Sequence, residues 1–468
     1  MNDQARRRTI FAAALAVCVF LPTALPAEEQ RKEQPPPGGT PKDFNLPGKQ
    51  AASLDNGLEV TAVRFGSVPK ATVVVAVRAG NLNDGDKTWL ADLAGDFLLE
   101  GTHTRSAEDI ARDAAAMGGA VNVAVGENLT TIGGDVLADF APQMVELLAD
   151  VVRNPRFSES ELERLRRDRL RQLSVASTQP DQMAHAAFRA ALYGDHPYGR
   201  MFPDEEQLAG YNLADVRGFY EENFGARRTH VFVSGVFDEE AVLAAVERAF
   251  GTWKSGAEPL DYPPDPAQGK VEVEIIDRPE ASQSNIYLGL SAIDPSHEDW
   301  IRLELTNTLL GGSFASRITR NIREDKGYTY SPFSTLSARR GDGYWAQVAA
   351  VTTDVTGPAL EEIYAEIERL REVPPPEDEL EGMQNYRAGV FVLQNSTRGG
   401  IVNVLSFLDL HELPETWLGE YVSNLFAVTP EEISETARRY LRPEDMTLVV
   451  VGDRSQVAEQ LPSPARAR

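Results

Sequence analysis

The chain has 468 residues, a formal net charge of −25 at pH 7, 42% hydrophobic residues, six histidines and one cysteine. The excess of acidic over basic residues argues against a nucleic-acid surface, because phosphate binding needs a basic one. A single cysteine excludes a disulfide framework and any cysteine-rich metal site. The hydrophobic fraction is high enough for sizeable cores, and the length suggests about three domains or two large ones.

The N-terminus has the pattern of a secretory signal peptide. Three arginines at positions 6–8 precede an apolar run over residues 10–21, and small residues then lead to Ala27. The run is too short to cross a bilayer comfortably, which disfavours the alternative of a membrane anchor. We therefore expect residues 1–27 to be removed and the mature chain to be exported, most simply to a bacterial periplasm.

The predicted elements of the first half follow a loose arm. Residues 28–48 are rich in Glu, Lys, Pro and Gly, which predicts a flexible arm that buries no core. Residues 49–254 have regular strand and helix patterns and are predicted to form an N-terminal domain. In chain order we expect strands at 58–63 and 72–78, helices at 88–100 and 106–117, two strands within 119–136, helices at 137–152 and 158–176, a strand at 229–235 and a helix at 238–251.

The second half repeats this pattern after a linker. Residues 255–270 contain four prolines and few large apolar side chains, so we interpret them as an interdomain linker. One repeat of roughly 200 residues indicates a domain duplication and not a solenoid. Consecutive strands followed by helices favour an α+β fold. We predict a C-terminal domain at 271–456 and a tail at 457–468, with strands at 271–276, 284–290 and 447–452 and helices at 297–310 and 313–323.

Short motifs run through about residues 50–455 in the order found in a known family. They are Leu54-Asp-Asn-Gly-Leu58, Val77-Arg-Ala-Gly80, Leu99-Glu-Gly-Thr102, Gly118-Gly119, Leu147-Leu-Ala-Asp-Val151, Asn154-Pro155, Tyr193-Gly-Asp-His-Pro-Tyr-Gly199, Leu310-Gly-Gly312, Ser316-Arg317 and Ile322-Arg-Glu-Asp-Lys-Gly327. On these motifs the chain resembles the pitrilysin-like (M16) zinc peptidases of the short two-domain type. The resemblance implies two homologous α/β-layered domains, each with a mixed or antiparallel sheet packed with helices, that form a clamshell.

The resemblance also implies a zinc site, and this chain departs from it at every position. Family members that cleave peptides carry His-x-x-Glu-His on a helix, where two histidines one turn apart share the metal and the Glu activates its water. A distal Glu completes the ligands. Here Asp92 and Asp96 stand at the histidine positions, Gly95 at the general base and Gln172 at the distal Glu.

These four residues predict a degenerate zinc site. A glycine cannot abstract a proton, and carboxylate and amide oxygens suit harder ions than zinc. We therefore expect this chain to bind no cofactor, and we interpret Asp92 and Asp96 as two solvated carboxylates on an open helix face. A weak Mg²⁺ or Ca²⁺ site is the alternative, although two carboxylates alone provide few ligands.

A second family feature is present. In the family, an Arg followed seven positions later by a Tyr binds the substrate backbone and stabilises the oxyanion of the tetrahedral intermediate. Arg323 and Tyr330 have this spacing. Arg supplies a fixed fork of donors and Tyr one O–H donor, which an anionic oxygen requires. The structural alternative is an arginine paired with Glu324 or Asp325 and a tyrosine in the core.

Further substrate contacts are implied by the same resemblance. Gly311 and Gly312 are assigned to substrate binding, as is Asn122. Asn122 lies in the segment that matches the family's edge strand, where a peptide adds as an extra strand through main-chain hydrogen bonds. An ordinary strand with one polar residue is the alternative. His196, before Pro197, is interpreted as structural.

The resemblance therefore implies a division of labour between subunits. Some family members work as heterodimers in which one subunit holds zinc and the other supplies the Arg/Tyr pair. We expect this chain to be the exported, non-zinc subunit that supplies Arg323 and Tyr330 to a zinc-bearing partner acting on peptides. The alternative is a catalytically inactive peptide-binding or scaffold protein of the same fold. Nucleic acid is not expected as a partner, nor is a membrane after signal cleavage.

Overall fold

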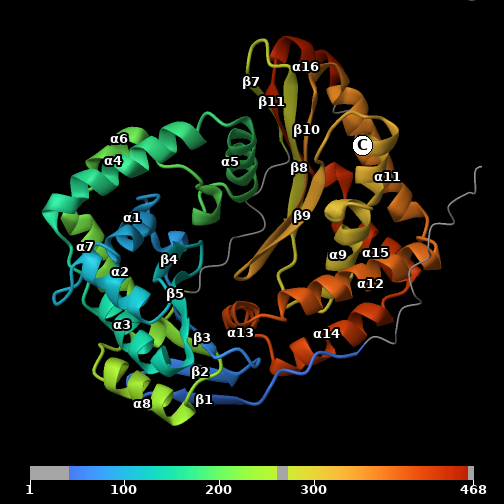
Figure 1. The fold of residues 1–468 in the computed structure, drawn as a ribbon. Coiled ribbons are helices and arrows are strands. Elements are labelled where there is room, and N and C mark those ends of the chain that lie inside the picture. The colour runs from blue at the N-terminus through green and yellow to red at the C-terminus, as the bar shows by residue number, and fades with distance from the viewer. Residues whose placement is uncertain (1–41, 261–271, 462–468) are drawn as a thin grey trace, which may run out of the picture. The chain divides into compact units, whose positions relative to one another are not determined.

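Two β-sheets packed by helices make up the described part of the chain (Figure 1). The structure is a computed structural model that describes residues 42–260 and 272–461. The predicted signal peptide, most of the predicted arm and much of the predicted linker and tail lie outside these ranges. Within them, no helix combines the length and the apolar character needed to cross a membrane.

The first sheet has six strands in a mixed arrangement. β6 runs parallel to β2 and antiparallel to β3, and the remaining pairs are antiparallel. In spatial order the strands are β1 (Lys49–Ser53), β2 (Glu59–Arg64), β6 (Thr229–Gly235), β3 (Lys70–Val77), β5 (Thr130–Leu137) and β4 (Asn122–Val125). The helices of this half are α1 (Leu90–Phe97), α2 (Ala107–Ala116), α3 (Ala141–Arg153), α4 (Glu159–Ala176), α5 (Pro180–Tyr193), α6 (Glu205–Gly210), α7 (Leu213–Asn223) and α8 (Glu239–Phe250).

The second sheet repeats this topology. Its closing strand, β11, runs parallel to β7 and antiparallel to β8, as β6 does to β2 and β3. In spatial order the strands are β7 (Val273–Asp277), β11 (Thr447–Gly452), β8 (Gln283–Ala292), β10 (Asp342–Thr352) and β9 (Phe333–Arg339). The helices are α9 (Trp300–Asn307), α10 (Arg317–Thr319), α11 (Thr356–Glu372), α12 (Glu377–Gln394), α13 (Arg398–Leu410), α14 (Glu415–Ala427), α15 (Pro430–Tyr440) and α16 (Arg454–Gln460). The α+β fold with two similar sheets is therefore confirmed.

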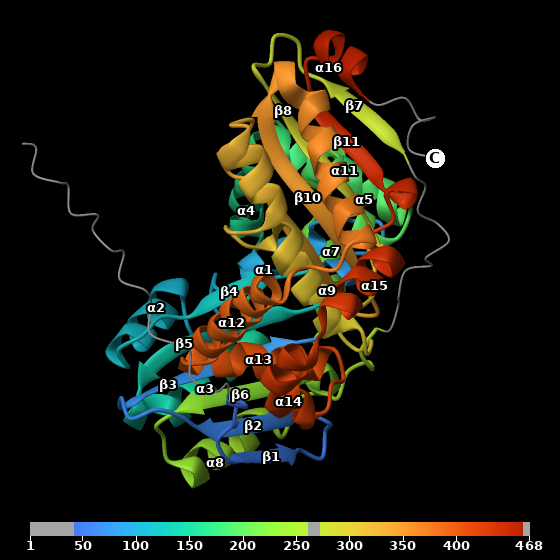
Figure 2. The ribbon, with the colours of Figure 1, turned by 90° about the vertical axis from the view of Figure 1, so that its right-hand side faces the viewer.

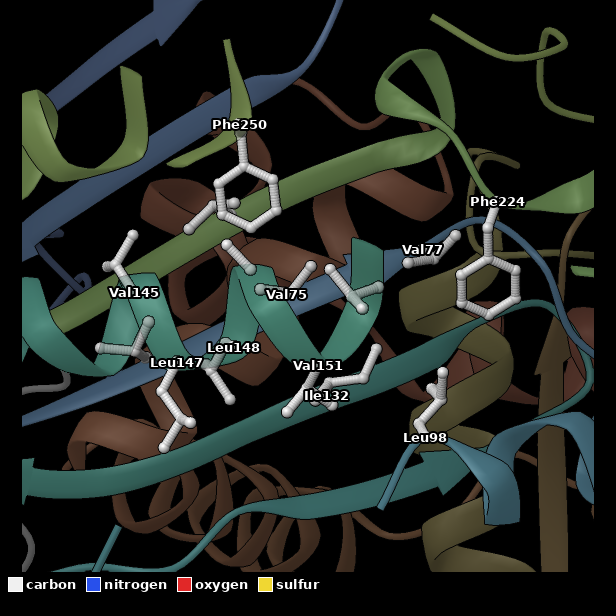
Figure 3. Packing of buried hydrophobic residues seen from close by; sticks show 14 of the residues in the cluster. Val75, Val77, Leu98, Ile132, Val145, Leu147, Leu148, Val151, Phe224 and Phe250 are labelled. Atoms are coloured by element: carbon white, nitrogen blue, oxygen red, sulfur yellow. The ribbon is translucent and has the colours of Figure 1, made fainter. Parts of the chain in front are cut away.

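Helix α3 shows why these segments fold as they do. Its residues Val145, Leu148 and Val151 recur at a spacing of three and have no solvent exposure, so they form one apolar stripe. Figure 3 shows this stripe among side chains that include Val75 of β3 and Ile132 of β5, and all five residues belong to one buried cluster. The apolar face of α3 thus covers one face of the first sheet.

The two halves exchange one helix each. α5 of the first half packs on β8 and β11 of the second sheet, where the ring of Phe188 lies against Gly289. α13 of the second half packs on β3 and β6 of the first sheet, where Ile401 and Val402 are buried against Phe232. Figures 1 and 2 both show α13 beside these strands. Each sheet therefore has one face covered by a helix of the other half.

Two predicted helices of the second half end differently from the expectation. The predicted helix at 297–310 is α9 followed by a π-helical segment, η6 (Thr308–Gly312), and the one at 313–323 is α10 followed by η7 (Arg320–Asp325). π-helical turns are rare and are frequent at functional sites. Residue spacing alone does not distinguish them from α-helix.

Candidate functional site

An arginine lies between Asp92 and Asp96, the two aspartates of the predicted degenerate zinc site. Arg169 of α4 donates from Nε to Asp96 Oδ2 at 2.6 Å and from Nη2 to Asp96 Oδ1 at 2.7 Å. Its Nη1 donates to Asp92 Oδ1 at 3.1 Å and to Gln172 Oε1 at 3.2 Å. A single guanidinium therefore joins three of the four residues of the degenerate zinc site.

This ion-pair cluster is largely withdrawn from water. The side chains of Arg169, Asp92 and Asp96 are 14%, 18% and 31% exposed. Burial raises the pKa of Asp92, and the charge of Arg169 opposes that shift. The interpretation of Asp92 and Asp96 as solvated carboxylates on an open face is therefore wrong. Two carboxylates one helical turn apart repel each other when buried, and Arg169 supplies the cation that both need.

The donor set does not fit zinc. Zinc in proteins takes mainly imidazole and thiolate ligands, whereas this cluster offers two carboxylates and an amide. The oxygens of all three groups already accept hydrogen bonds from Arg169. A metal ion between them would have to displace the guanidinium and leave it buried without its partners, which is strongly unfavourable.

Gly95, at the predicted general-base position, packs directly against a side chain of the neighbouring strand β4. A Cβ atom on Gly95 would lie 2.5 Å from Val125 Cγ2 and 3.7 Å from Val123 Cγ1, so α1 and β4 approach more closely than a larger residue permits. A glutamate at this position would require the Val125 side chain to shift. The close approach also accounts for the apolar residues of β4, because both valines pack against the first core.

The predicted edge strand lies at a sheet edge. β4 is the last strand in the order of the first sheet, and Asn122 at its start is exposed. Its substrate role stays a prediction.

Two residues that the sequence reasoning missed hold α1 in place. The carboxylate of Asp84 accepts hydrogen bonds from the backbone N–H groups of Trp89 (2.9 Å) and Ala91 (2.7 Å), at the start of the helix. Asn81 Nδ2 donates to Asp92 Oδ2 at 2.6 Å. Burial raises the pKa of Asp84 to about 7. Asp84 lies four residues before the predicted helix start at residue 88 and six before Leu90, the first residue of α1, which is too distant for an ordinary N-cap.

The second candidate site brings four predicted residues together. Gly311, Gly312, Arg323 and Tyr330 line one cavity of about 320 Å³. The glycines end η6 and Arg323 lies on η7, so both π-helical segments contribute to the cavity. Asn122 is not among its lining residues.

Arg323 is held by aromatic rings. Its guanidinium carbon lies 4.2 Å from the ring centre of Phe314 and 5.4 Å from that of Tyr330, within the range of cation–π attraction. Tyr330 is 82% exposed, which rules out a core tyrosine. Within residues 42–260 and 272–461, no carboxylate forms an ion pair with Arg323, so its pairing with Glu324 or Asp325 is also wrong.

The two glycines that line the cavity pack tightly against the protein interior. A Cβ atom on Gly311 would lie 2.6 Å from both Gln347 Oε1 and Ser334 Oγ, and one on Gly312 would lie 2.6 Å from Asn307 Nδ2. Neither position accepts a side chain. The two glycines therefore let η6 pack closely against buried polar side chains of α9, β9 and β10.

Two family profiles match this chain. The profile described as "Insulinase (Peptidase family M16)" matches residues 61–204, and the one described as "Peptidase M16 inactive domain" matches residues 211–386. An uncharacterized zinc protease of Mycobacterium bovis is 27% identical over 406 residues, which cover 83% of this chain and 90% of the relative. An uncharacterized zinc protease of Bacillus subtilis is 24% identical over 404 residues, which cover 85% and 97%.

Two solved structures have the same fold. A crystal structure of a peptidase M16 inactive domain from Pseudomonas fluorescens has a TM-score of 0.80 at 22% identity and covers 86% of this chain and 98% of its own. The crystal structure of a protease from Helicobacter pylori has a TM-score of 0.81 at 18% identity and covers 87% and 100%.

Proposed function

Because this chain belongs to the M16 peptidase family, we propose that it is the non-zinc subunit of a two-subunit peptidase. In this proposal Arg323 and Tyr330 complete the active site of a zinc-bearing homologue that hydrolyses peptides. The exported location predicted from residues 1–27 is part of the same proposal.

One contrast supports the proposal more than any other observation. At the degenerate zinc site, Arg169 satisfies the carboxylates of Asp92 and Asp96, so the site is closed. At the other site, Arg323 has no carboxylate partner among the described residues, and Tyr330 projects into solvent. A buried cation with partners is typical of structure, whereas an exposed donor pair beside a cavity is typical of binding.

The chemistry of the pair suits a developing oxyanion. The partner's zinc would polarise the peptide carbonyl and activate water. The residues of this chain would donate hydrogen bonds: the guanidinium edge of Arg323 to backbone oxygens, and the Tyr330 hydroxyl to the oxygen on which negative charge grows. The cation–π contact with Phe314 restrains the guanidinium before substrate binds, which lowers the entropic cost of its contact with substrate.

Reconstitution with a zinc-bearing M16 homologue from the same source tests the proposal. The isolated chain should contain no stoichiometric zinc by elemental analysis and should cleave no peptide, and mixing should create or greatly raise activity. Tyr330→Phe should then lower kcat by roughly 10²-fold, the scale of a lost oxyanion donor. Tyr386→Phe is the matched control, because it removes a hydroxyl from the same cavity. Tight zinc in the isolated chain, or full partner activity without it, would contradict the proposal.

The alternative is an inactive peptide-binding or scaffold protein. The closed ion-pair cluster around Arg169 fits it equally well, since that cluster removes the catalytic metal and nothing else. The Tyr330→Phe experiment separates the two functions. A scaffold keeps its assembly and its binding when this hydroxyl is removed, whereas a catalytic half loses turnover.

A further inference from the structure

One histidine of the first sheet faces two carboxylates where the two halves of the chain meet. His230 of β6 is paired in register with Glu59 of the parallel strand β2, and Asp409 comes from the last turn of α13. The Nδ1 atom of His230 is 3.1 Å from Asp409 Oδ1 and 3.4 Å from Glu59 Oε2. We call Glu59, His230 and Asp409 the junction cluster.

The junction cluster borders an apolar contact between the halves. α13 packs on β6, and the buried side chains of Phe232 and Ile401 meet in that contact. The side chains of His230 and Asp409 are mostly buried, whereas that of Glu59 is 58% exposed. Charged groups at such a border are costly unless they are paired, so this cluster requires a physical explanation.

The charges of the cluster favour a cation between its members. Arg78 pairs with Asp409 Oδ2 at 3.2 Å, which leaves Oδ1 facing His230. Within residues 42–260 and 272–461, the ion-pair contact of Glu59 is with His230 alone. A proton on Nδ1 makes one good hydrogen bond and serves one carboxylate well. A divalent ion binds the nitrogen and both carboxylates at once.

The spacing of the three ligand atoms suits a metal ion. Imidazole nitrogen and carboxylate oxygen bind zinc at about 2.0–2.2 Å in a tetrahedral arrangement, so neighbouring ligand atoms lie roughly 3.3–3.5 Å apart. The two distances from Nδ1 are close to this separation, and all three ligand atoms lie within 4.8 Å of one another. The exposed side chain of Glu59 has room to adjust, and it gives an ion a path of entry from solvent.

The imidazole of His230 is oriented as a metal ligand requires. When Nδ1 binds a metal, the ring proton lies on Nε2 and needs an acceptor. The hydroxyl oxygen of Thr61 lies 2.9 Å from Nε2 and is in place to accept that proton. The ring also stacks on Phe232, with ring centres 4.0 Å apart. Both contacts hold Nδ1 toward the two carboxylates.

We propose that Glu59, His230 and Asp409 form a binding site for a divalent transition-metal ion, with Zn²⁺ as the probe. The ion would join β2 and β6 of the first half to α13 of the second half. One imidazole with two carboxylates favours such an ion over Mg²⁺ or Ca²⁺, which prefer oxygen ligands alone.

This site is separate from the ion-pair cluster around Arg169, and the inference does not depend on the proposed function. Its three ligands include the exposed Glu59, so the ion is held exchangeably and a chelator removes it. The chain purified in EDTA is therefore the zinc-free chain of the reconstitution experiment.

Metal titration of the isolated full chain tests the site. After treatment with EDTA and dialysis, isothermal titration calorimetry with Zn²⁺ should show one saturable site per chain. An excess of Mg²⁺ should not displace the ion. Zn²⁺ should also raise the Tm, because it binds the folded chain and links α13 to the first sheet.

Ligand variants assign the binding to the junction cluster. His230→Gln and Asp409→Asn should each weaken Zn²⁺ binding by at least about 100-fold and remove the rise in Tm. Thr61→Val nearly keeps the shape of a buried side chain and loses the acceptor for Nε2, so it should weaken binding by roughly 10-fold. His103→Gln is the matched control, because His103 is an exposed histidine outside the cluster and its loss should leave Zn²⁺ binding unchanged.

Three results would overturn the inference. The first is the absence of a saturable Zn²⁺ site in the native chain. The second is an affinity that His230→Gln and Asp409→Asn leave unchanged while circular dichroism shows both variants folded. The third is binding that Mg²⁺ displaces or that His103→Gln removes, which would assign the zinc to the acidic surface or to a surface histidine. In each case the reconstitution result stands.

Discussion

The guanidinium of Arg169 forms a two-pronged hydrogen bond with the carboxylate of Asp96, with Nε–Oδ2 and Nη2–Oδ1 distances of 2.6 Å and 2.7 Å. This geometry is the strongest that an arginine and a carboxylate adopt. It turns what would be a metal centre into a structural ion pair, and it makes the cluster a target for stability measurements.

Removing this arginine should be costly. Arg169→Ala leaves Asp92 and Asp96 buried without their cation, and we expect a loss of about 3 kcal/mol in the free energy of unfolding. Urea denaturation followed by circular dichroism measures it. Arg164→Ala is the control on the same helix, because Arg164 is 44% exposed and its ion pairs should contribute less than about 1 kcal/mol. Equal losses in the two variants would show that the cluster is not specially stabilising.

At Gly95, replacement by alanine should change stability in the direction opposite to the usual one. Replacing a helical glycine with alanine normally stabilises a protein by roughly 0.5–1 kcal/mol. Here the added Cβ would meet Val125 Cγ2 at 2.5 Å, so Gly95→Ala should destabilise the chain by about 1–3 kcal/mol. The double variant with Val125→Ala should recover part of that loss. An additive double variant would mean that the contact with Val125 is not the cause.

The buried carboxyl of Asp84 predicts a pH dependence. Its pKa is raised from 3.8 to about 7 in the folded chain, so between these values the folded state holds a proton that the unfolded state has released. The stability that the protonated Asp84 carboxyl contributes is therefore fully present below about pH 4, and it is lost as the pH rises to about 7. The free energy of unfolding of the native chain should fall relative to that of Asp84→Asn over this window. Asp86→Asn, at an exposed position of the same loop, should track the native chain at every pH.

Arg323 should not be replaceable by lysine. A lysine keeps the charge but loses the planar fork that stacks on Phe314 and reaches two oxygens at once. In the reconstituted complex, Arg323→Lys should lower kcat/KM nearly as much as Arg323→Ala, by roughly 10²-fold. If the lysine variant keeps native activity, charge alone is sufficient and the stacked geometry has no role.

The strands and the duplication could be predicted because they depend on local patterns. Apolar runs and turn residues mark β3 and β6, and the same patterns recur at β8 and β11. The arginine that pairs with Asp92 and Asp96 could also have been predicted from the sequence. Arg169 lies three residues before Gln172, on the same face of a helix, and two adjacent carboxylates require a cation.

Other features could not be predicted because tertiary contacts decide them. The sequence pattern around Arg323 does not distinguish a π-helical turn from an α-helical one, and the extra residue of the turn becomes evident only in the folded chain. The close approach of α1 to β4 depends on the absence of a side chain at Gly95, which a sequence presents only as a missing functional group.

The exchange of α5 and α13 between the halves has a consequence for folding and gene architecture. Either half produced alone would present a bare apolar sheet face, where Phe188 or Ile401 of the missing helix is normally buried. Each product should be prone to aggregate, and co-expression of the two fragments should rescue both. A protease cut between residues 260 and 272 should leave the fragments associated through ion pairs such as Arg78–Asp409 as well as through the exchanged helices. The duplicated halves should therefore unfold as one cooperative unit, with a single transition in thermal denaturation.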